Sequence, residues 1–179
     1  MASLDDAAAA YDKIGYSIAA FHHATEAYKI APELAAANVA AVVWSDWGAF
    51  KLESYDATSY NARLLMEAGV VTSLHSDDAE ISTRMNWEAG KLLRSGVTEL
   101  QAMSTVTNQA AKAIAIDNRI GSLEAGKDAD FVVWSHDPLD PALALELVQH
   151  ELHAAAREPA HLDRRRRPSA SHTSEPQKA

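Results

Sequence analysis

The feature that most constrains the fold is a repeated order in which a helical stretch is followed by a short apolar stretch. Three of these stretches are short, apolar and partly β-branched, as buried strands are: residues 16–21, 39–44 and 70–74. Strands separated by helices of this length are typical of parallel βαβ units, in which helices cover both faces of the sheet. The sequence therefore predicts an α/β fold with a parallel sheet.

Local signals place helices before, between and after these strands. Gly15 is a typical residue at a helix C-terminus, and Pro32 is expected to kink or divide the helix that contains it. The sequence Thr98-Glu99-Leu100-Gln101 has the capping-box pattern of a helix start. The predicted helices are residues 4–14, 25–37, 58–68, 80–93 and 98–114.

Charge and residue usage narrow the class of protein. The net charge of −9 argues against a nucleic-acid surface spread over the whole molecule. The chain has no cysteine, so His, Asp and Glu are the remaining metal ligands. Its acidic start is unlike a secretory signal, and its apolar runs fall short of the roughly 18 residues that a membrane span needs. We expect a cytoplasmic protein that binds neither nucleic acid nor membrane.

Polar side chains follow the predicted strands, at the edge where barrels and open α/β enzymes place their chemistry. His22 and His23 follow the first strand, and at most one of them faces a barrel interior unless the strand has already ended. His75 precedes Asp77 and Asp78 after the third strand. An aspartate there can bind a divalent metal and take a proton from water, or it can simply cap the next helix.

Other polar and aromatic residues near the strand ends have two open interpretations. Glu26 can face the same site, or it can stabilise the first turn of the following helix. Trp44 and Trp47 flank Asp46 and fit either a pocket wall or the core. The histidines also fit a purely structural role with hydrogen-bonded rings.

Four stretches taken together resemble, in order, the end of the amidohydrolase superfamily: residues 21–29, 74–78, 84–89 and 121–130. The last, Gly-Ser-Leu-Glu-Ala-Gly-Lys-Asp-Ala-Asp, is the most specific. The nearest branch is the imidazolonepropionase-like amidohydrolases, and the resemblance extends from about residue 10 to about residue 140. It implies strands six to eight of a TIM-type (β/α) barrel together with part of a small flanking β-sandwich.

The resemblance also implies a chemistry and its residues. His23 and Asp77 would be metal ligands, and Asp77 would also move the proton while a non-peptide C–N bond of a cyclic amide or amidine is hydrolysed. The implied cofactor is a divalent metal, zinc above all, and the implied substrate is a small molecule. We place His75, Trp47 and Glu26 at the substrate.

The sequence also departs from the family pattern. The His-x-His pair, the bridging lysine and the strand-five histidine have no counterpart, and Asn108-Gln109-Ala110 stands where Asn-Pro-Ala is usual. One His and one Asp should not hold a catalytic zinc, because such sites commonly use three protein ligands and a water. We therefore expect no activity from the isolated chain. The alternative is a non-catalytic remnant or an assembly module, which self-associates or complements a separate N-terminal half through exposed barrel edges.

The expected organisation has four parts. Residues 1–117 form the βα units of the barrel, and residues 118–140 form the return strand of the β-sandwich. Residues 141–156 form a terminal helix. Residues 157–179 hold four consecutive arginines and few apolar residues, which predicts a disordered basic tail.

Overall fold

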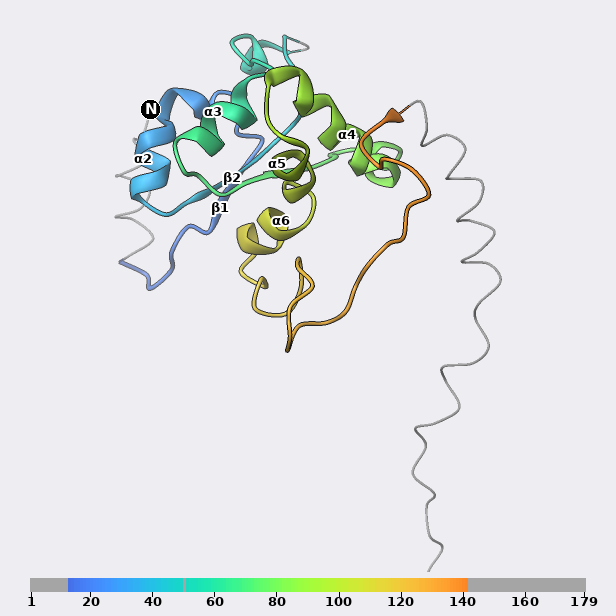
Figure 1. Cartoon of the computed structure of the whole chain (residues 1–179). Coiled ribbons are helices and arrows are strands. Elements are labelled where there is room, and N and C mark those ends of the chain that lie inside the picture. Colours follow the sequence, from blue (N-terminus) through green and yellow to red (C-terminus); the bar gives the residue numbers. More distant parts are fainter. Residues whose placement is uncertain (1–12, 50, 142–179) are drawn as a thin grey trace, which may run out of the picture.

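A computed structural model describes residues 13–49 and 51–141, which form a small parallel sheet with helices packed against it (Figure 1). The strands are β1 (Ala20–His22), β2 (Ala40–Val43) and β3 (Thr72–Leu74), in the order β1-β2-β3. Both pairs are parallel. The prediction of an α/β fold with a parallel sheet is confirmed, although each strand is shorter than expected.

The connection between β1 and β2 contains two short helices rather than one. These are the 3-10 helix η1 (Ala27–Ile30) and the helix α2 (Ala31–Ala36). Pro32 lies in the first turn of α2, where its missing N–H costs no intrahelical hydrogen bond. The division of the helix at the proline is therefore confirmed.

The second connection and the region after β3 are also helical. The second connection contains η2 (Leu52–Ser54) and α3 (Asn61–Glu67). After β3 the chain forms η3 (Ile81–Arg84), α4 (Met85–Lys91), η4 (Leu92–Ser95), α5 (Glu99–Ser104) and α6 (Asn108–Ala113).

The prediction of one continuous helix over residues 98–114 is wrong. Its start is as expected, because Thr98 and Gln101 form the predicted capping box at α5. The break follows from Thr105, which is fully buried and whose carbonyl oxygen accepts hydrogen bonds from Leu74 N (3.2 Å) and Ser73 Oγ (3.0 Å). That carbonyl is directed to β3, so α5 ends and α6 starts afresh at Asn108.

The core lies on both faces of the sheet. On one face β2 packs against the helices, whose buried leucines Leu34, Leu65 and Leu92 are at most 1% exposed. Burying each such side chain contributes about 1.5–3 kcal/mol. On the other face, Ala113 of α6 packs against small strand residues that include Ala40 and Val42. The sheet is therefore covered on both faces, and the carboxyl ends of its strands lie at one edge.

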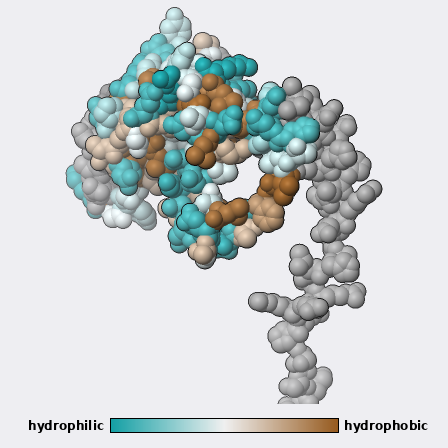
Figure 2. Space-filling view, viewed as in Figure 1, coloured by the Kyte–Doolittle hydropathy of each residue, from teal (hydrophilic) through white to brown (hydrophobic). Residues whose placement is uncertain are grey.

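No strand is present in residues 118–140, all of which the structure describes. The apolar residues Phe131, Val132 and Val133, where we expected one, are 69%, 60% and 74% exposed. In Figure 1 this part of the chain (orange) is an open loop away from the sheet, and Figure 2 shows hydrophobic atoms on the corresponding surface. A strand needs a neighbour for its backbone hydrogen bonds, and this segment has none among the described residues. Its assignment to a flanking β-sandwich stays a prediction.

The remaining predictions fall largely outside the described residues. These are most of the helix over 4–14, the helix over 141–156 and the basic tail over 157–179. Within the described ranges, no helix combines the length and the apolar character that crossing a membrane requires.

Candidate functional site

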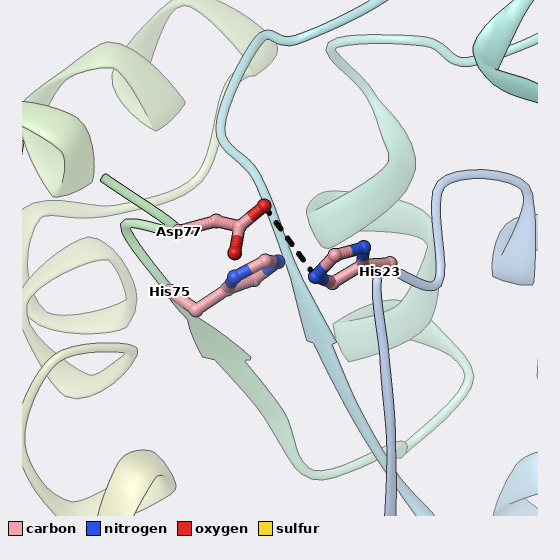
Figure 3. Close-up of side chains that lie close together, drawn as sticks. All are labelled: His23, His75 and Asp77. Atoms are coloured by element: carbon pink, nitrogen blue, oxygen red, sulfur yellow. Dashed lines mark ion pairs between the residues drawn. The ribbon is translucent and has the colours of Figure 1, made fainter.

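Three side chains meet at the carboxyl ends of β1 and β3: His23, His75 and Asp77 (Figure 3). His23 directly follows β1, whereas His75 and Asp77 follow β3. One ligand atom from each residue lies within 4.8 Å of the others, and His23 Nε2 is 3.6 Å from Asp77 Oδ2. Parallel strands end at the same edge of a sheet, which is why residues over fifty positions apart share one place. The structure thus brings together the two residues that we predicted as metal ligands.

His23 and Asp77 both have a left-handed backbone conformation, with φ of 55° and 49°. Few residues other than glycine adopt it, although His, Asp and Asn do so more often than most. β1 has already ended at His22, so the alternation of strand side chains no longer applies at His23. The sharp turn directs the His23 ring over the strand ends and toward Asp77 (Figure 3).

The loop that follows His23 is fixed by Asn61, the first residue of α3. Its side chain is buried, with Oδ1 accepting a hydrogen bond from Tyr28 N (3.0 Å) and Nδ2 donating to Ala24 O (2.8 Å). The oxygen and the NH2 group of this side chain amide are therefore both used to hold the loop. A buried, doubly bonded amide of this kind rigidifies the backbone around it.

The choice between Asp77 and Asp78 as a helix cap is resolved by their hydrogen bonds. Asp78 Oδ1 accepts from Glu80 N (2.8 Å) and Ile81 N (2.9 Å), at the start of η3. Asp77 instead faces His23. The adjacent carboxylates thus have different partners: Asp78 holds the backbone N–H groups at the entry to η3, and Asp77 faces His23.

His75 lies among aromatic rings. Its ring is stacked on His23 at a centroid distance of 5.0 Å, and it contacts Trp44 at 4.6 Å and His22 at 6.0 Å. Its Nε2 is buried and has no hydrogen-bond partner among the described residues. Burial, followed by the nearby His23, lowers the pKa of His75 to about 4, although Asp77 acts in the opposite direction. The imidazole is therefore neutral at pH 7.

The other two predicted substrate-binding residues lie outside this cluster. Trp47 stacks on Trp44 at 5.4 Å with nearly parallel rings, so it is one ring removed from His75. Glu26 forms an ion pair with Lys29 at 2.7 Å. Contact of either residue with a substrate stays a prediction.

A buried polar network beside the site escaped prediction. Glu88 of α4 is 6% exposed and accepts a hydrogen bond from Ser45 Oγ at 2.6 Å. Lys91 Nζ lies 2.9 Å from Glu88 and 3.1 Å from Asp46. Burial lowers the pKa of Lys91, but the hydrogen bonds to Glu88 and Asp46 outweigh it and raise that pKa. The network ties α4 to the loop after β2, in which the two stacked tryptophans lie.

Glu88 lies within residues 84–89, which resemble the family, but neither its charge nor its spacing distinguishes it from a surface residue. A Glu three positions before a Lys on a helix is typical of an exposed ion pair, and Ser45 is one of many serines at strand ends. Only the packing of α4 against the sheet shows that the carboxylate is buried.

The donor set of the cluster fits a divalent metal. Two imidazoles and one carboxylate are ligand types that zinc and similar ions prefer. The buried, unpartnered Nε2 of His75 adds an available nitrogen at this place. The structure therefore supplies the chemistry that the predicted cofactor requires.

The chain is thus an α/β protein with a parallel sheet, and two histidines and an aspartate that could hold a metal ion lie at the carboxyl ends of its strands. Comparison with protein families matches residues 9–160 to the amidohydrolase family. The chain belongs to the amidohydrolase family, as the sequence resemblance predicted.

Individual relatives agree with this assignment. The amidohydrolase tasK of Hapsidospora irregularis is 31% identical over 130 residues, which cover 69% of this chain and 13% of that protein. The imidazolonepropionase of Geobacillus sp. (strain WCH70) is 35% identical over 79 residues, covering 41% of this chain and 18% of that one. The crystal structure of an amidohydrolase from Thermotoga maritima MSB8 has a TM-score of 0.67 and 34% identity, covering 76% of this chain and 37% of that one. The chain thus spans well under half the length of these relatives.

Proposed function

We propose that this chain supplies strands six to eight of an amidohydrolase (β/α) barrel, with residues 118–140 as the return strand of the flanking β-sandwich. Its chemistry is the metal-dependent hydrolysis of a non-peptide C–N bond in a small molecule, of the cyclic amide or amidine type. Membership of the amidohydrolase family supports a hydrolase function. The observation that carries the proposal is the 3.6 Å separation of His23 Nε2 and Asp77 Oδ2 at the ends of two parallel strands.

Each site residue has a role in this proposal. His23 and Asp77 hold a divalent metal, with zinc inferred from the family. Such an ion supplies activation of water, whose pKa falls from about 15.7 to about 7 when it is bound. The Asp77 carboxylate accepts the proton of the attacking water and returns it to the leaving nitrogen. His75, Trp47 and Glu26 contact the substrate.

The isolated chain is expected to be inactive. The side chains of His23 and Asp77 are 45% and 48% exposed, so water screens them and the site is open. The 179 residues contain no His-x-His pair that could add further family ligands. The activation of water corresponds to roughly 12 kcal/mol, and it depends on a metal held firmly in a water-excluding site.

Assay of the isolated chain tests the inactivity. The purified protein, supplied with zinc or manganese, is expected to hydrolyse neither cyclic amides nor amidines. Turnover that Asp77→Asn abolishes would show that the chain is an active enzyme by itself and would overturn this part of the proposal.

Complementation tests the function itself. The chain is co-expressed with the part of the Thermotoga maritima amidohydrolase that precedes the matched region, and the complex is assayed for C–N hydrolysis. Asp77→Asn should lower the rate at least about 100-fold, as loss of a general acid–base does. Asp78→Asn is the matched control, because Asp78 holds the backbone at the entry to η3 and should leave the rate nearly unchanged. Turnover that is equally fast with Asp77→Asn contradicts the proposed role of Asp77.

The alternative is a non-catalytic remnant or an assembly module that complements a separate N-terminal half. Within the described residues, β1 and β3 pair with no strand other than β2, so each has an outer edge without a partner strand, although Leu74 N of β3 donates to Thr105 O. A stable, folded complex that never turns over substrate would favour this alternative over an enzyme.

A further inference from the structure

His75 is the one residue of the cluster to which the family resemblance gives no role as a metal ligand. It lies two positions before Asp77 in the chain. We propose that His75 is a metal ligand in this chain, and that His23, His75 and Asp77 together bind one divalent cation without residues from any other chain. This inference takes only one point from the proposed function, namely that the bound ion is a divalent metal. It goes further by giving the site a third protein ligand, and the metal contact replaces the substrate contact that was proposed above for His75.

The distances among the three ligand atoms are close to those that a bound ion requires. Zinc bonds of about 2.0–2.2 Å in a tetrahedral arrangement place two ligands about 3.4 Å apart. His23 Nε2 and Asp77 Oδ2 are already 3.6 Å apart, and no pair in the cluster exceeds 4.8 Å. The His23 and His75 rings are stacked with an interplanar angle of 13°, so a shared ion requires the half-exposed His23 ring to turn until its Nε2 and the His75 nitrogen point to one place.

The surroundings of His75 favour a bound ligand over a purely structural role. A structural histidine in a protein interior normally has hydrogen-bonded nitrogens. The Nε2 of His75 is buried and unpartnered among the described residues, although the ring contacts His23 and Trp44. The ring is thus positioned while one nitrogen remains available.

The number and type of ligands also match. Three protein ligands with an open position for water are characteristic of catalytic zinc sites, whereas structural sites use four. Two imidazoles and one carboxylate accept zinc and also cobalt, nickel or iron(II), because the set contains no soft thiolate. A cobalt(II) complex is therefore a suitable spectroscopic probe.

Metal titration of the complete, metal-stripped chain tests the inference. Zinc is titrated in competition with a chromophoric chelator, and cobalt(II) is followed by its visible absorption. The wild-type chain should bind one equivalent, and His75→Gln should weaken binding by about tenfold or more, because loss of even an outer-shell partner of a ligand costs about 10–100-fold in affinity. His136→Gln is the control, because His136 is exposed and lies outside the cluster.

A second variant separates ligation from packing. His75→Phe keeps an aromatic ring against Trp44 and His23 but has no nitrogen to offer. In EDTA, the circular dichroism spectrum of His75→Phe should match that of the wild type, which shows that the variant is folded. It should then lose as much zinc affinity as His75→Gln and give no tetrahedral cobalt(II) spectrum. Unchanged affinity in a folded His75→Phe chain, or no zinc binding by the wild type, would overturn the inference.

This result is separable from the proposed function. If zinc affinity depends on His75 but the complemented complex does not turn over substrate, His75 is a metal ligand and the hydrolase proposal is wrong. If turnover requires Asp77 but zinc affinity does not depend on His75, the hydrolase proposal holds and the third ligand is wrong.

Discussion

The backbone of His23 and Asp77 carries strain at the two residues that matter most to the site. Their φ values of 55° and 49° cost roughly 1 kcal/mol each relative to a right-handed conformation. Such conformations persist where surrounding contacts determine them, as Asn61 does for the loop after His23. Both residues of the 3.6 Å contact between His23 Nε2 and Asp77 Oδ2 have this unusual conformation, which indicates that the fold holds the cluster in place.

Folding stability should depend on the protonation of His75. Its pKa falls from 6.5 to about 4 on folding, so the unfolded chain binds the proton more tightly. The stabilisation is complete above pH 6.5 and is lost as the pH falls toward 4. In urea unfolding with EDTA, we expect a loss of about 1 kcal/mol between pH 6.5 and 5, after discounting for partial exposure.

The matched variant for this measurement is His75→Gln, which should show a flatter stability profile over the same pH range. The charged and titratable neighbours are His22, His23 and Asp77, and they remain in the variant. An identical slope in both proteins would assign the pH dependence to those neighbours rather than to His75.

The sequence predicted part of this site at the level of single residues. His23 and Asp77 could be found because each comes soon after a short apolar strand, and the position after a parallel strand is informative by itself. Two features had no such signal. The contact of His75 with Trp44 depends on how two strands lie side by side, and the buried Glu88 depends on how α4 lies against the sheet.

At the scale of elements, Gly90 governs how the chain returns to α4 after the exposed loop. A Cβ at Gly90 would lie 3.1 Å from the backbone carbon of Leu139 and still closer to its carbonyl oxygen. Leu139 is 4% exposed, and Asn86 Nδ2 donates to Pro138 O at 2.6 Å. The absence of a side chain at Gly90 is therefore what lets residues 138–139 pack on α4.

Gly90→Ala should destabilise the protein although alanine is the better helix former. Propensity alone would stabilise α4 by about 1 kcal/mol, whereas the clash with backbone atoms of Leu139 should cost about 1–3 kcal/mol beyond that gain. We expect a lower Tm and faster amide exchange over residues 137–140. A higher Tm would show that the contact with Leu139 is absent in solution.

The predicted elements succeeded where the local sequence decides the outcome. Pro32 and the Thr98–Gln101 capping box act within one helical turn, and both appear as expected. The break at Thr105 follows from hydrogen bonds to β3, over thirty residues earlier in the chain. A strand over 131–134 needs a partner strand, which no local pattern can guarantee.

For the whole molecule, the unpaired sheet edges and the exposed apolar loop predict self-association. Val132→Lys should reduce concentration-dependent association in sedimentation velocity, because Val132 is 60% exposed in the apolar loop and a charged side chain there opposes hydrophobic contact between copies. Leu52→Lys is the control, at a site in η2 that is 90% exposed. An equal effect of both substitutions would indicate non-specific hydrophobic contact, and no association by the wild type would remove the prediction.

The strand order β1-β2-β3 has a consequence for how the protein is made. Among the described residues, every strand pairs with one that is synthesised directly before or after it, so each βα unit can dock onto its predecessor while translation continues. During translation, Asp77 is therefore the last residue of the cluster to be made, and it joins a sheet edge at which His23 already lies.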